Sequence, residues 1–203
     1  GFGGQEFIPE VLKKTKILLF LLIKNFLENI YGDKNGCVSA FAHYLYTYPL
    51  RKDGNKFVKN ALKNGAGGVI TSLAIKRNIK KIIRVKNITS FLNQFAKLKR
   101  EHNLAKIIAI TGSAGKTSLK NLINDLLENI GKTYSSPKSF NNHLGVPISL
   151  SNLNFNDKFG IFEVGMSKAG EIKNLSKLIQ PHIGVITNIG EAHIENFKNI
   201  KGI

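Results

Sequence analysis

Thr111-Gly-Ser-Ala-Gly-Lys-Thr117 decides how this sequence folds, because of the residues on either side of it. The preceding residues 106–111 form a continuous apolar run typical of a buried strand, and residues 118–129 carry Leu and Ile at the spacing of an amphipathic helix. The two glycines allow a tight turn whose backbone N–H groups can face a phosphate, and the helix start adds partial positive charge there. The pattern predicts a phosphate-binding loop between a strand and a helix.

Two side chains of this loop have the chemistry to act on a nucleotide. Lys116 can reach the β- and γ-phosphates as a point charge, and the hydroxyl of Thr117 can bind Mg²⁺. The spacing departs from the standard Walker A motif, because Ile110 stands five residues before Gly115. The alternative interpretation is a glycine-rich turn that carries a solvated lysine.

The second half of the chain alternates strand and helix patterns. Residues 159–164 and 183–187 read as further strands, with a helix at 171–179 between them. This alternation predicts a mostly parallel, doubly wound sheet in a second domain of residues 104–203. Ligands collect at the carboxyl ends of such strands, where Glu163 and Thr187 fall.

The first half predicts a smaller α/β domain in residues 1–103. A helix is expected at 57–62, short strands at 69–71 and 81–85, and a helix at 89–102. Residues 1–52 show no pattern that assigns them a role.

Three further groups are candidates for the site. A carboxylate that ends a strand, as Glu163 does, can hold Mg²⁺ or polarise an attacking group, although such an acid is often a surface or capping residue. His193 follows a strand end and can contact metal or phosphate, or be structural. Asn141 and Asn142 offer amide groups to a ligand, or form a polar turn.

Composition narrows the classes of function. The 203 residues carry a formal net charge of +17, and residues 1–103 hold 19 basic and 6 acidic groups. A basic chain of this kind is compatible with binding to nucleic acid, to an anionic membrane or to a phosphorylated small molecule. The single cysteine excludes an internal disulfide framework and a cysteine-based zinc site. The longest apolar run, residues 17–23, falls short of the roughly 20 residues that span a bilayer.

Four segments in their order along the chain resemble the central ATPase domain of the Mur ligases, the ATP-dependent amide-forming enzymes of peptidoglycan assembly. The short loop Thr-Gly-Ser-x-Gly-Lys-Thr is that family's own form, which accounts for the departure from Walker A. The other segments resemble the branch that adds D-alanyl-D-alanine to UDP-N-acetylmuramoyl-tripeptide. They are Phe140-Asn-Asn-His-Leu-Gly-Val-Pro147, Glu163-Val-Gly-Met-Ser-Lys-Ala-Gly-Glu-Ile172 and Thr187-Asn-Ile-Gly-Glu-Ala-His-Ile-Glu-Asn-Phe197.

The resemblance implies a ligase that uses ATP and Mg²⁺ to form an acyl phosphate, which the amine of D-alanyl-D-alanine then attacks. It implies catalytic roles for Lys116, Glu163 and His193, with Thr117 as a ligand of one Mg²⁺ and Glu163 and His193 as ligands of a second Mg²⁺. Asn141 and Asn142 would meet the UDP-muramoyl peptide. ATP would be bound by Gly112, Ser113, Ala114, Gly115, Lys116, Thr117 and Ser118. We expect a cytoplasmic monomer without nucleic-acid partners or stable membrane insertion.

The sequence also departs from the family. Ala114 stands where many relatives have Asn, and little loss is expected because backbone groups do most of the binding there. Residues 1–52 lack the family's pattern for the uridine nucleotide. The family's carbamylated lysine is expected a few residues beyond Ile203, so the central domain is expected to be truncated and the chain inactive alone.

Two alternatives stay open at this point. The chain could be another amide ligase of the superfamily, related to folylpolyglutamate or cyanophycin synthetases, although the Glu-x-Gly-x-x-x-x-Gly-Glu-Ile segment argues against it. It could also be a basic nucleic-acid-binding module, although its Lys and Arg residues are dispersed and accompany no known motif.

Overall fold

The chain divides into two compact units, Gly1–Ile88 and Thr89–Ile203, which are described separately. Among the residues described, no helix has both the length and the apolar character needed to cross a membrane. The structure, a computed structural model, describes residues 58–63, 69–72, 82–137, 140–191 and 194–196.

The first unit contains one helix and two short strands among its described residues. Helix α3 (Val58–Lys63) precedes strand β1 (Val69–Thr71), and β1 pairs in parallel with β2 (Ile82–Arg84). Runs of β-branched residues favour strands because these side chains fit the pleated surface. The predicted helix and both predicted strands are therefore confirmed, whereas residues 1–52 lie outside the described part of the chain.

In its described residues the second unit has four parallel strands, in the order β4-β5-β3-β6. The predicted parallel sheet is confirmed, with the strand before the glycine-rich loop at an inner position. Its elements are α4 (Ile88–Glu101), β3 (Lys106–Thr111), α5 (Lys116–Glu128), β4 (Thr133–Ser135), α6 (Gly145–Asn152), β5 (Phe159–Glu163), α7 (Glu171–Ile179), β6 (Ile183–Ile186) and the 3₁₀ helix η2 (Ile194–Asn196).

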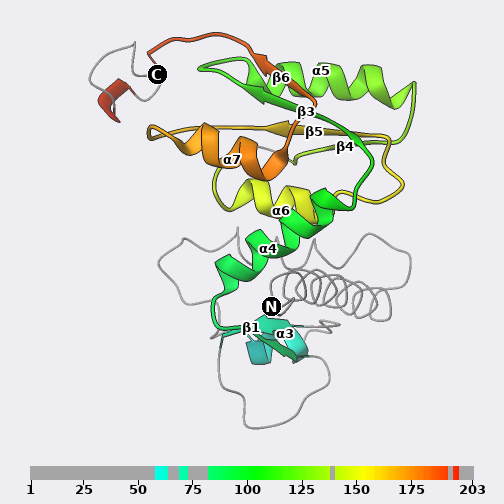
Figure 1. Ribbon diagram of the computed structural model, residues 1–203, viewed down its shortest axis with the longest axis vertical. Helices are drawn as coiled ribbons and strands as arrows, with labels where there is room; N and C mark the ends of the chain where they lie inside the picture. The colour runs from blue at the N-terminus through cyan, green and yellow to red at the C-terminus, as the bar shows by residue number, and fades with distance from the viewer. Residues whose placement is uncertain (1–57, 64–68, 73–81, 138–139, 192–193, 197–203) are drawn as a thin grey trace, which may run out of the picture. The chain divides into compact units, whose positions relative to one another are not determined.

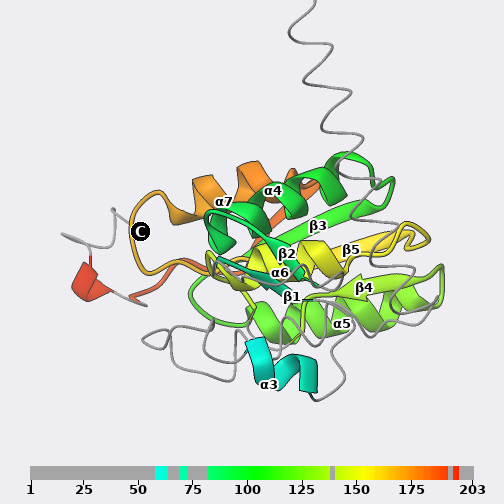
Figure 2. The same cartoon turned by 90° about the horizontal axis from the view of Figure 1, so that it is seen from below.

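Helices cover both faces of this sheet. Figure 1 and Figure 2 together show α5 on one side of the sheet, and α4, α6 and α7 on the other. The core between sheet and helices is apolar and includes Ile107, Phe162, Leu150 and Ile179, each fully buried. In the strand register, Ile110 lies opposite Glu163 and Thr111 opposite Ile186, so the carboxyl ends of β3, β5 and β6 meet at one edge.

Helix α4 is fixed to the second unit by a buried arginine. Arg100 donates from Nε to the carbonyl of Ile179 at 2.7 Å and from Nη2 to that of Gln180 at 2.7 Å. A cation suits the carboxyl end of α7, where backbone carbonyls lack helical partners. Burial lowers the pKa of this guanidinium. Residues 89–101 of α4 thus belong to the second compact unit.

One strand and one α-helix have no counterpart in the sequence-based prediction. Strand β4 has three residues, too few for a period to show. Helix α6 is buried all round from Gly145 to Ser151, so it has no polar face and reads as a loop. The amphipathic pattern of α5 was also only partly right, because Leu122 and Leu126 are 57% and 59% exposed.

Candidate functional site

The glycine-rich loop joins the inner strand β3 to helix α5, as predicted (Figure 1). Gly112 has φ 135° and Gly115 has φ 77°, backbone conformations that favour glycine. A Cβ on Gly112 would collide with Oγ1 of Thr187 and lie 2.9 Å from the carbonyl oxygen of Asn188. Helix α5 starts at Lys116, directly after the loop, so the N–H groups of its first turn, which have no partner within the helix, lie at the loop.

The segment Thr187–Gly190, which follows β6, holds the first half of this loop in place. Asn188 accepts from the N–H of Ala114 through Oδ1 at 2.9 Å and from the N–H of Ser113 through its backbone oxygen at 3.1 Å. The hydroxyl of Thr187 donates to the carbonyl of Ala114 at 2.5 Å. Ser113 and Gly190 exchange two further hydrogen bonds. The backbone N–H and the backbone carbonyl of Ala114 are thus both engaged by this segment.

Lys116 lies back on its own loop. Its Nζ donates to the carbonyl of Gly112 at 2.6 Å and lies 3.5 Å from that of Ser113. The ammonium is half-buried at the surface of a cleft of about 480 Å³. Lys116, the predicted phosphate ligand, thus lines the cleft while its ammonium is bound to the loop.

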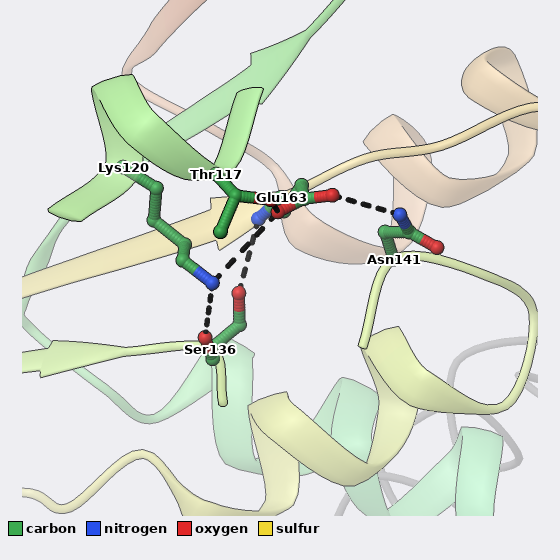
Figure 3. A network of polar contacts seen from close by, with 5 residues as sticks. All are labelled: Thr117, Lys120, Ser136, Asn141 and Glu163. Atoms are coloured by element: carbon green, nitrogen blue, oxygen red, sulfur yellow. Dashed lines mark hydrogen bonds and ion pairs between the residues drawn. The ribbon is translucent and has the colours of Figure 1, made fainter. Parts of the chain in front are cut away.

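Glu163 is the centre of a polar network at the carboxyl edge of the sheet (Figure 3). The side chain is 1% exposed. Its Oε2 accepts from the hydroxyl of Thr117 at 2.8 Å, and its Oε1 accepts from the amide of Asn141 at 2.8 Å. Thr117, Asn141 and Glu163 were predicted for the site from three separate segments. In the structure, the first two donate hydrogen bonds to the carboxylate of the third.

Two members of the network escaped the sequence-based prediction. Lys120, on α5, is 2% exposed; its Nζ donates to the carbonyl of Ser136 at 2.7 Å and lies 3.8 Å from Oε2 of Glu163. The hydroxyl of Ser136 accepts from the N–H of Glu163 at 3.2 Å. Burial lowers the pKa of Lys120, and the neighbouring carboxylate opposes that shift. One feature of the sequence could have indicated Lys120: it follows Thr117 by one helical turn and so lies on the same face of α5.

The network borders an open cleft. Asn142 also lines it, but its Oδ1 accepts from the N–H groups of Leu144 and Gly145 at 3.1 and 2.9 Å, so this side chain organises the start of α6. The cleft is lined by residues of the loop, of residues 141–143 and of residues 165–172, and by Ile186, Asn188 and Ile189.

Glu171 also lines the cleft and was not predicted as a site residue. Its Oε2 accepts from the N–H groups of Ser167 and Lys168 at 2.6 and 3.0 Å. The N–H of Ser167 is the main cause of the lowered pKa of this carboxyl. The segment from Gly165 to Gly170 is thereby tied to the first turn of α7.

Few side chains at this site could bind a metal ion. Among the residues described, no three His, Cys, Asp or Glu side chains gather at one place. Mg²⁺ does not require such a cluster, because it is commonly held by one or two carboxylates together with phosphates and waters. Thr117 and Glu163 offer the oxygen donors it prefers, so they fit. His193 lies outside the described residues, and Ser118 is exposed on α5.

Sheet, loop and carboxylate together make the second unit a P-loop α/β domain. Residues 110–203 match the Mur ligase middle domain.

Two curated relatives are UDP-N-acetylmuramoyl-tripeptide–D-alanyl-D-alanine ligases. That of Rickettsia prowazekii is 41% identical over 75% of this chain and 34% of its own length. That of Bacillus subtilis is 34% identical over 95% of this chain and 45% of its own length. The second alignment extends into residues 1–52, which the sequence patterns left unassigned. The chain thus spans between a third and a half of these relatives.

A solved structure agrees with the fold. The crystal structure of MurF ligase from Thermotoga maritima in complex with ADP superposes with a TM-score of 0.65 and is 30% identical. The match covers 76% of this chain and 36% of that one.

Proposed function

We propose that this chain supplies the nucleotide-binding part of an ATP-dependent ligase that joins D-alanyl-D-alanine to UDP-N-acetylmuramoyl-tripeptide. The names of the Rickettsia and Bacillus relatives support the reaction, and the ADP complex of the Thermotoga ligase supports the nucleotide. In this proposal residues 104–203 are the central ATP-binding domain and residues 1–103 an N-terminal domain. The enzyme works as a monomer in the cytoplasm, where ATP and the UDP-linked substrate occur.

The observation that carries the proposal is the hydrogen bond from Thr117 to Glu163, at 2.8 Å. It joins the start of the helix after the loop to the end of the neighbouring strand β5. A hydroxyl and a carboxylate in this relation form the oxygen-donor pair at which a P-loop protein places Mg²⁺ beside its phosphates. A solvated glycine-rich turn would not require a buried acid at this point.

The loop binds ATP through residues 112–118. N–H groups at the start of α5 and the partial charge of the helix end face the phosphates. Lys116 leaves the carbonyl of Gly112 and takes a phosphate oxygen instead, which offsets charge during phosphoryl transfer. The Thr187–Gly190 segment keeps the loop in one conformation, so that less ordering is needed when the nucleotide binds.

Thr117 and Glu163 would hold Mg²⁺, with His193 as a second-metal ligand. When bound, the ion stabilises the negative charge that develops on the transferred phosphoryl group. The carboxylate is already oriented, because Asn141 fixes one oxygen and Thr117 the other. Asn141 thereby sets the direction of Glu163 from the side of the cleft.

The cleft takes the muramoyl peptide. Asn141 and Asn142 line it opposite the loop, so the substrate carboxylate can approach the γ-phosphate between them. An oxygen of that carboxylate attacks the γ-phosphorus and ADP leaves, which gives an acyl phosphate. The amine of D-alanyl-D-alanine then attacks the acyl carbon through a tetrahedral intermediate, and phosphate leaves as the amide forms. Holding the groups in line is the main contribution of the cleft.

Calorimetry with ATP and Mg²⁺ tests the binding half of this proposal on the purified chain. The reaction is tested on the complete protein that carries this segment, with UDP-muramoyl-tripeptide and D-alanyl-D-alanine, and mass spectrometry detects the pentapeptide product. Glu163→Gln is expected to lower kcat more than it raises the KM for the dipeptide. Turnover of folate and glutamate, without pentapeptide, would assign the protein to another amide ligase of the superfamily.

A further inference from the structure

Lys120 places a cation beside the carboxylate proposed to receive the metal. Its ammonium is buried to 2% exposure, anchored on the carbonyl of Ser136 at 2.7 Å and 3.8 Å from Oε2 of Glu163 (Figure 3). Lysine is almost never fully buried unless it is paired. The Ser136 carbonyl and the Glu163 carboxylate are among the partners that hold it in this position.

Lys120 faces the same carboxylate oxygen of Glu163 that would bind the metal. Oε2 of Glu163 accepts from the hydroxyl of Thr117 and also faces Lys120, whereas Oε1 is turned to Asn141. A divalent ion bound between Thr117 and Glu163 would share Oε2 with the ammonium. In a buried site the repulsion between two such cations is screened only weakly.

We propose that Lys120 is a built-in counter-ion of Glu163, which prevents the site from taking up a divalent cation alone and makes uptake depend on the negative charge of a bound nucleotide. This inference rests on the proposed function, because it concerns the same metal site. Lys120 acts through Glu163 and is a positioning residue.

The charges around the site support this dependence. Without nucleotide, the single negative charge of Glu163 is balanced by Lys120, and Lys116 adds a second positive charge at the loop. Phosphates bound at the loop would reverse that balance. The cation would then enter as a metal–nucleotide complex rather than bind first.

The experiment measures Mn²⁺ binding to the full chain by electron paramagnetic resonance, with and without ADP. The wild-type chain should bind Mn²⁺ weakly in the absence of ADP. Lys120→Met should tighten this nucleotide-free binding about tenfold, because the repelling charge is gone while the carboxylate stays. A role in packing alone would leave the affinity unchanged or weaken it, and either result would overturn the inference.

Two further variants locate the effect. The double variant Lys120→Met with Glu163→Gln should lose the gain in Mn²⁺ affinity, since the gain depends on the carboxylate. Lys173→Met, the same change at an exposed position on α7, should match the wild type. A gain that survives in the double variant would place the ion elsewhere and also overturn the inference.

Removal of a buried partner can prevent folding, so a second route is needed. Lys120→Gln keeps an amide that can donate to Ser136 and serves if the Met variant is insoluble. If neither folds, the double variant with Glu163→Gln should restore folding, because it removes the unpaired buried charge. Failure of that rescue would refute the counter-ion role.

The same titrations separate this inference from the proposed function. If the wild-type chain binds no ADP or ATP, the proposed function fails. The comparison of nucleotide-free Mn²⁺ affinities between wild type and Lys120→Met still decides the role of Lys120.

Discussion

The ammonium of Lys116 donates to the carbonyl of Gly112 at 2.6 Å, so the lysine of the loop is bound to the loop's own first glycine. Gly112 directly follows β3, and Lys116 is the first residue of α5. The lysine must exchange this carbonyl for a phosphate oxygen when a nucleotide binds. Its contribution to folding is therefore small, and its contribution to binding is large.

Lys116→Ala tests this separation. The free energy of unfolding should change by less than about 1 kcal/mol, because a half-buried hydrogen bond to a carbonyl is lost. ATP affinity should fall roughly thirtyfold, which corresponds to about 2 kcal/mol for a charge-assisted contact to phosphate. Urea unfolding and calorimetry measure the two quantities. Unchanged ATP affinity would remove Lys116 from the nucleotide site.

Two glycines of the loop, with Gly184 in β6 for comparison, allow a graded test of the loop's backbone. Gly184→Ala in β6 should cost little, since no atom lies within 4 Å of the new Cβ and its φ is not positive. Gly115→Ala also finds open space but has φ 77°, so about 1 kcal/mol of strain is expected. Gly112→Ala combines φ 135° with a collision against Thr187 and Asn188, and should cost the most. Urea unfolding of the three variants should follow this order, and an equal cost for all three would contradict it.

Much of this loop could be predicted from sequence because its signals are local. The apolar strand, the two glycines and the start of the helix are contiguous, and Glu163 ends an apolar strand of its own. Lys120 could not be predicted in this way, because a lysine on a helix is read as solvated until Glu163 and Ser136 are seen beside it.

Helix α6 and the contacts of Asn188 could not be predicted from local sequence signals either. Helix α6 has no polar face, so its pattern lacks a helical period. Asn188 belongs to a segment that resembles the Mur ligases. Its contacts with Ser113 and Ala114, however, join residues far apart in sequence. Contacts that depend on the pairing of β3 with β6 leave no periodic signal in either segment.

Asn188 provides the next test. Asn188→Ala removes the acceptor for the N–H of Ala114, so the loop should lose order and ATP affinity should fall. Asn188→Asp keeps an acceptor oxygen but adds negative charge beside the loop. Its stability should therefore stay within about 0.5 kcal/mol of the wild type, while ATP affinity still falls through repulsion. Thermal unfolding with parallel ATP titrations distinguishes the two variants, and full ATP affinity in both would show that the segment does not shape the loop.

His182 gives the chain a pH dependence whose sign follows from its contacts. Its Nδ1 accepts from the N–H of Ile107 at 2.9 Å, at the start of the β3–β6 pairing, which requires that nitrogen to be unprotonated. Burial is the first cause of the lowered pKa of this imidazole, and the charges of Arg100 and Lys106 add to it. The folded chain therefore takes up a proton less readily than the unfolded chain, whose His pKa is 6.5. The contribution to stability is complete above that value and is lost as the pH falls below it.

Urea unfolding of the full chain between about pH 7.5 and about pH 5.5 measures this effect. The wild type should lose stability across the interval, and His182→Ala should lose less, because one group that titrates differently in the two states is gone. Lys106→Ala should also flatten the profile, since one of the two positive charges that oppose protonation is removed. Identical pH profiles for the wild type and His182→Ala would show that the imidazole contributes nothing to the pH dependence. In that case the contact with Ile107 would add to stability equally at each pH tested.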